Sequence, residues 1–153
     1  MHYHLELIMP PTENIEESIE QILEEYNENF SSQEEGKVKN QQAFYDYWVI
    51  GGRCSGRKAG GDIMPISNIP DDLTAFRVII AKRHWRNDGT LDAGFMLAKE
   101  IWNGANWQET IWDGTVKSAL NEHQEYLKNC SNEYALKNTP QTDWLCATID
   151  YHS

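Results

Sequence analysis

Alternation of apolar and polar residues predicts a β-strand at the start of the chain. In HYHLELIM, residues 2–9, the odd-numbered positions are apolar, while positions 2, 4 and 6 are His, His and Glu. This period of two is typical of a half-buried strand. A helix is expected next, because apolar residues recur every three or four positions from Ile15 to about Asn27 and glutamates fill most of the places between them.

Further along the chain, β-branched and aromatic runs predict more strands, and a second apolar stripe predicts a second helix. The polar, aperiodic stretch 28–41 is expected to be a loop, and 99–114 is rich in turn residues. An Asp-Gly pair within 86–90 predicts a tight hairpin. The expected strands are 43–50, 74–82, 91–97 and 143–152, and the expected helix is 115–130.

These elements predict one α+β domain spanning 1–153, because no linker or internal repeat divides the chain and its length suits a single core. We expect a mostly antiparallel sheet with two amphipathic helices on one face. The ferredoxin-like βαββαβ arrangement is one topology that fits. If the first and last strands are neighbours, as in that arrangement, the polar face of the sheet combines His2, His4 and Glu6 with Thr148, Asp150 and His152.

Three histidines on one sheet face have two interpretations. They could hold a metal or act as a pair of general acid–base imidazoles in phosphodiester chemistry. Alternatively, they could simply belong to an exposed polar face, which antiparallel sheets often have. The second interpretation is favoured, because the HxT and HxS pairs of two-histidine phosphoesterases are missing. We therefore predict no catalytic residue, no bound metal and no cofactor.

Charge and cysteine content limit the partners and the compartment. The formal net charge of −11 argues against general binding to long nucleic acids or anionic membranes. No basic leader and no long apolar run is found, so no membrane association is expected. Cys54, Cys130 and Cys146 form no CxxC pair, which favours reduced thiols in a cytosol.

The most unusual stretch is YWVIGGRCSGRKAGGD, residues 47–62. Its glycines would let backbone N–H groups approach a ligand, and its two arginines and one lysine match phosphate oxygens. It is neither a P-loop nor a dinucleotide-binding GxGxxG turn. Either it is a solvent-exposed connection, or it holds a small anion.

The distribution of charge favours an anion site. Residues 13–35 hold nine glutamates and no basic residue, whereas 53–86 hold seven of the thirteen Lys and Arg. A local positive pocket on an acidic protein selects a small phosphorylated ligand over a long polyanion. Most of the six tryptophans are expected in the core, but those in the turn-rich stretch could stack on a base. The candidate ligand-binding residues are Trp48, Gly51, Gly52, Arg53, Ser55, Gly56, Arg57, Lys58, Arg83, His84, Trp102 and Trp107.

The stretch YDYWVIGGRCSG resembles the W-x-x-I-G-G-R-W-S-G segment of small, acidic, bacteriophage-encoded proteins that have no assigned chemistry. Their last strand often ends in Asp-x-His, as IDYHS does here. Cys54 stands where the segment has an aromatic residue.

The resemblance implies a phage accessory protein in the host cytoplasm that counters host defence. With the basic loop, it favours a protein that sequesters a small phosphorylated nucleotide signal without cleaving it. Two alternatives stay open. The first is a phosphodiesterase that cleaves a cyclic nucleotide signal, for which the histidine face, carrying His2, His4 and His152, must lie beside the glycine loop, residues 47–62. The second is an acidic inhibitor that binds a host defence complex through the glutamate-rich helix. The sequence does not decide whether the pocket lies within one chain or between subunits of a homo-oligomer.

Overall fold

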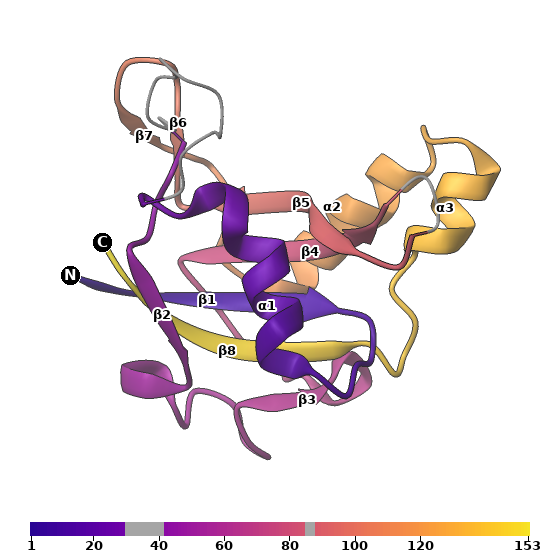
Figure 1. Ribbon diagram of the computed structural model, residues 1–153, viewed down its shortest axis with the longest axis horizontal. Coiled ribbons are helices and arrows are strands. Elements are labelled where there is room, and N and C mark those ends of the chain that lie inside the picture. The colour runs from indigo at the N-terminus through magenta and orange to yellow at the C-terminus, as the bar shows by residue number, and fades with distance from the viewer. Residues whose placement is uncertain (30–41, 85–87) are drawn as a thin grey trace.

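A computed structural model describes residues 1–29, 42–84 and 88–153 (Figure 1). Most of the loop expected at 28–41 and part of the turn expected at 86–90 lie outside the described residues. The helices are α1 (Ile15–Leu23), α2 (Val116–Leu127) and α3 (Asn132–Asn138). The strands are β1 (His2–Met9), β2 (Tyr47–Ile50), β3 (Ile63–Pro65), β4 (Arg77–Arg83), β5 (Leu91–Ala98), β6 (Glu100–Trp102), β7 (Trp107–Glu109) and β8 (Leu145–His152).

The main sheet has the order β2-β8-β1-β4-β5, and β3 pairs with the other half of the same edge of β8. The α+β class with a mostly antiparallel sheet is confirmed, and so is the pairing of the first strand with the last. The ferredoxin-like topology is not confirmed. There, another strand separates the two parallel strands of a βαβ unit, whereas β4 lies directly beside β1 and parallel to it.

The helices cover opposite faces of the sheet, not one face as expected. Residues Ile19 and Ile22 of α1 pack with Leu5 and Leu7 on one face of the sheet. Val116 of α2 packs with the residues of β1 and β4 that point to the opposite face. Figure 1 shows α1 in front of the sheet. The sequence carried a signal of this: both Leu-Ile-Met at 7–9 and Val-Ile-Ile at 78–80 are continuous apolar runs, as strands buried on both faces have.

Two further features bear on the sequence predictions. The three cysteines are free thiols, as expected. Within the described ranges, none of the helices combines the length and apolar character that crossing a membrane requires.

Candidate functional site

The glycine loop lies against the polar side of β8 and β1 because both of its ends are fixed to one strand edge. β2 pairs with residues 149–152 of β8 before the loop, and β3 pairs with 145–147 after it. The short 3-10 turn Gly52–Cys54 begins the loop. The chain between the two strands therefore has to fold over the polar residues of β1 and β8, and the histidine face lies directly beside the loop.

Most polar groups of the loop bind to the protein itself. The Arg53 amide donates to Asp150 Oδ2 over 2.8 Å, and the Gly51 amide donates to the Thr148 carbonyl. The Ser55 hydroxyl and the Gly56 amide both donate to the Asp62 carboxylate. These contacts hold the loop against the sheet, and the Arg53 and Arg57 side chains remain exposed and available to a ligand.

Lys58 has an internal role that differs from the predicted one. Its ammonium group is fully buried and lies 2.8 Å from Glu6 Oε1 and 2.8 Å from the Cys146 carbonyl. Glu6 also accepts from Thr148 and contacts the His4 ring. The polar face around His4 and Glu6 is therefore a buried, hydrogen-bonded network under the loop, and its expected exposure to solvent is wrong.

Beyond this network, at the end of the sheet, two histidines are each held by a carboxylate. His2 Nδ1 lies 2.8 Å from Asp150 Oδ1, and His152 Nδ1 lies 2.8 Å from Asp46 Oδ1. A carboxylate of this kind only accepts hydrogen bonds, so Nδ1 carries the proton and Nε2 faces away with its lone pair when the ring is neutral. Among the described residues, neither Nε2 atom has a hydrogen-bond partner.

The two rings face each other across paired strands. His2 and His152 are direct partners in the β1–β8 register, and their ring centroids are 5.2 Å apart at an interplanar angle of 70°. Tyr47, which is 48% exposed, stacks on His152 with a centroid distance of 5.0 Å. We call His2, His152, Asp46, Asp150, Tyr47 and Arg53 the paired-histidine site.

Electrostatics keep both carboxylates of the paired-histidine site ionised. The hydrogen bond from His152 lowers the pKa of Asp46. Burial acts to raise the pKa of Asp150, but the Arg53 amide, the His2 ring and the charges of both residues outweigh it, so this pKa is lowered as well. Each carboxylate can therefore orient its imidazole and stabilise the protonated ring.

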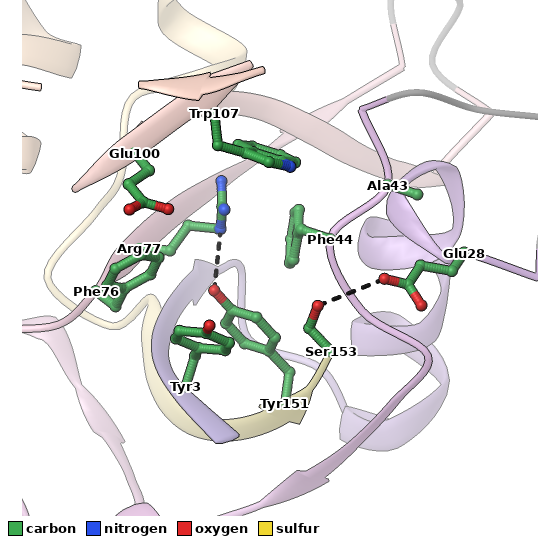
Figure 2. Close-up of a pocket in the computed structure, with 10 residues that line it drawn as sticks. All are labelled: Tyr3, Glu28, Ala43, Phe44, Phe76, Arg77, Glu100, Trp107, Tyr151 and Ser153. Carbon is green, nitrogen blue, oxygen red and sulfur yellow. Dashed lines mark hydrogen bonds between the residues drawn. The ribbon is translucent and has the colours of Figure 1, made fainter. Parts of the chain in front are cut away.

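The other candidate residues of the sequence analysis lie elsewhere. Trp48 donates from Nε1 to Glu20 of α1, on the opposite face. Arg83 is the last residue of β4 and His84 follows it. Because β4 is parallel to β1, both lie at the sheet end opposite His2. His84 pairs there with Asp92. Trp102 and Trp107 form a cross-strand pair in the β6–β7 hairpin, and Trp107 borders a separate pocket with Arg77 (Figure 2).

Sequence reasoning discussed His2 and His152 but favoured no role for them, and its candidate list omits them together with Asp46, Tyr47 and Asp150. The signal that could have found them is the pair of stretches used for the phage resemblance. YDYWVIGGR and IDYH pair with each other as β2 and β8, so the Asp and His residues of the two stretches meet.

Within the described ranges, no group of three or more His, Cys, Asp or Glu side chains is arranged to hold a metal. The chain matches no family model, no curated protein and no solved structure.

Gly52 connects the loop to this site, and its substitution should disturb the site. A Cβ atom there would lie 2.5 Å from Asp150 Oδ2 and 2.7 Å from Val49 Cγ2, at a φ of +52°. We expect Gly52→Ala to lower the free energy of unfolding by about 1–3 kcal/mol and to shift the NMR signals of the His2 ring.

Gly56→Ala is the matched control for this experiment. Gly56 also has a positive φ, but nothing lies within 4 Å of its would-be Cβ. Urea unfolding of both variants separates backbone strain from the clash at Asp150. Equal losses of stability and unchanged His2 signals in both variants would show that Gly52 does not support the site.

Proposed function

We propose that the protein is a phosphoesterase that acts on a small phosphorylated nucleotide at the paired-histidine site. The observation that carries this proposal is the pair of imidazoles, each fixed at Nδ1 by an ionised carboxylate and each with Nε2 unpartnered among the described residues. Two positioned imidazoles can act as general base and general acid in one reaction.

The chemistry follows from these positions. One neutral imidazole accepts the proton of an attacking water or ribose hydroxyl at Nε2 while the new P–O bond forms. The other, protonated imidazole gives its Nε2 proton to the leaving oxygen as the old P–O bond breaks. No electrons are exchanged with a cofactor, and the two rings end in exchanged protonation states. The Arg53 guanidinium supplies charge for the phosphoryl oxygens.

Two further features support a small nucleotide as substrate. The exposed Tyr47 ring beside His152 offers a surface on which a base can stack. The net charge of −11 repels a long polyanion, whereas a small ligand needs only the local cations. The phage resemblance supports a cytoplasmic role against host defence, in which the substrate is a nucleotide signal.

Sequestration without cleavage is the second candidate for the same site. It is favoured by Arg53 and Arg57, both exposed in the same loop, because guanidinium groups suit phosphate binding whether or not the bond is cut. Sequestration and cleavage differ only in what happens to the bound ligand.

The test incubates the protein with cyclic dinucleotides, a cyclic ADP-ribose-type signal and linear dinucleotides, then heat-denatures it and analyses the nucleotides by mass spectrometry. We expect a linear or shortened product from at least one of them. Ligand-induced thermal stabilisation with intact recovery would replace cleavage by sequestration. Neither product nor stabilisation, or equal activity in Arg53→Ala, would contradict a nucleotide site here.

A further inference from the structure

A second pocket lies on the opposite face of the same sheet end. It is lined by aromatic side chains from five segments, together with Arg77, Glu28 and Glu100 (Figure 2). Tyr3 and Tyr151 in its wall alternate with His2 and His152 along β1 and β8, so they point away from the paired-histidine site. The pocket is thus separate from the site of the proposed phosphoesterase reaction. Its aromatic lining residues are Tyr3, Phe44, Phe76, Trp107 and Tyr151.

The guanidinium of Arg77 is the unusual group in this pocket. Arg77 is only 2% exposed, yet no carboxylate among the described residues lies within ion-pair distance of it. Within the described part of the chain, its side chain donates a long hydrogen bond of 3.4 Å from Nε to the Tyr151 hydroxyl and another from Nη1 to the Met96 sulfur. Buried arginines normally have a counter-charge. Residues 1–29, 42–84 and 88–153 supply none within ion-pair distance of Arg77, and an anionic ligand would supply one.

Aromatic rings hold the guanidinium in place. Its carbon lies 3.9 Å from the centre of the Phe44 ring and 5.7 Å from the Trp107 ring. Figure 2 shows the guanidinium beside the Phe44 ring and below the Trp107 ring. Such contacts restrict the orientation of the planar group while its N–H edge can still donate to an oxyanion.

We propose that this pocket binds a small aromatic carboxylate, with the carboxylate on Arg77 and the ring among the aromatic side chains. The pocket volume is about 140 Å³, close to the ~150 Å³ cavity that accommodates benzene in another protein. The ligand is therefore of single-ring size.

The charge of the lining selects a monoanion over a phosphate ester. Glu28 and Glu100 both border the pocket, so a dianion on Arg77 would meet two like charges. A single carboxylate meets less repulsion, and a hydroxyl or amino group on its ring can donate to one of these carboxylates. A hydroxybenzoate or aminobenzoate combines these features.

The test measures binding by isothermal titration calorimetry and tryptophan fluorescence with four probes of matched size. They are benzoate, 4-hydroxybenzoate, the neutral benzamide and phenyl phosphate. We expect saturable binding of the two carboxylates, tightest for 4-hydroxybenzoate, and at least 10-fold weaker binding of benzamide and phenyl phosphate. Arg77→Met should weaken carboxylate binding about 10- to 100-fold.

Two control variants make the outcome specific. Arg53→Met changes the paired-histidine site and should leave benzoate affinity unchanged, so failure here and failure of the phosphoesterase proposal are distinguishable. Arg77→Lys keeps the charge without the planar group and should bind benzoate with intermediate affinity. Binding by this variant would also show that replacing Arg77 does not by itself unfold the protein. Absence of binding at millimolar benzoate, equal binding of benzamide, or unchanged affinity in a folded Arg77→Met protein would overturn the proposal.

Discussion

Replacing His152 by Gln is expected to lower the turnover of a cleaved nucleotide about 10²- to 10⁴-fold, the range typical of a lost general acid or base. The same loss is expected for His2→Gln. Ligand affinity should change far less, because the glutamine amide can still contact a phosphate oxygen and Arg53 is intact. Since the two rings act in one step, the double variant should be little worse than either single variant. Steady-state kinetics with the nucleotide found in the panel measures all three.

His84→Gln is the matched control for these variants. His84 also pairs with an Asp carboxylate, Asp92, but it is half-exposed and lies at the opposite end of the sheet. Its replacement should leave turnover unchanged. Turnover that survives in both His2→Gln and His152→Gln would exclude the imidazoles from catalysis and leave only binding at this site.

The pH profile of this reaction follows from the same arrangement. One imidazole has to be neutral and the other protonated, so kcat/KM should be bell-shaped. Hydrogen bonding to His152 lowers the pKa of Asp46, and the Arg53 amide and the His2 ring lower that of Asp150 in spite of its burial. Both carboxylates therefore stay ionised below neutral pH, and we expect that titration of Asp46 or Asp150 does not cause the acidic limb.

Glu6→Gln is the second substitution with a large expected effect, and it acts on stability. Glu6 and Lys58 are both fully buried, with 2.8 Å between carboxylate and ammonium. The amide would leave the ammonium buried without a counter-charge, which costs about 3–5 kcal/mol in comparable pairs. Urea unfolding at neutral pH should record a loss of this size. Exchanging both partners for apolar residues, Glu6→Leu with Lys58→Met, should recover much of it.

An exposed pair is the control for Glu6→Gln. Glu125 and Lys128 are also 2.8 Å apart, but both side chains are mostly in solvent. Glu125→Gln should change the free energy of unfolding by less than about 1 kcal/mol. Similar effects of the two substitutions would show that the buried pair does not stabilise the fold.

Glu6 also makes stability depend on acid. Burial acts to raise its pKa, but the contacts with His4, Lys58 and Thr148 outweigh burial and hold the pKa below its usual 4.5. A carboxyl with a lower pKa in the folded state contributes its full stabilisation above the unfolded value and loses it as the pH falls through the folded value. The stability of Glu6→Gln should therefore fall less steeply in that acidic range than that of the natural chain.

Local periodicity was sufficient to predict the long elements, because strands and amphipathic helices leave direct traces in the sequence. The alternation in residues 2–9, the stripe beginning at Ile15 and the apolar run in β4 all correspond to observed elements. The short helix α3 and the strands β3, β6 and β7 were missed, because elements of seven or three residues carry too few periods to recognise.

The candidate site was only partly predictable for a related reason. Pairing of the first and last strands placed His2 opposite His152 and His4 opposite Asp150, as their common alternation indicated. The basic and aromatic composition of one segment predicts Lys58, Trp48, Arg83 and His84 as ligand residues. These residues are close in sequence but do not lie together in the structure, because β4 runs toward the other end of the sheet and Lys58 turns inward to Glu6.

The α+β class, the long elements and the alternation that brings the histidines to one face could be predicted from the sequence, since these depend on local periodicity and on strand pairing. The sequence did not predict that α1 and α2 cover opposite faces, that the glycine loop closes over Glu6, or that Asp46 and Asp150 reach His152 and His2. These contacts join residues far apart in the chain. Their partners depend on which sheet edge β2 and β3 add to, and no local pattern specifies that edge.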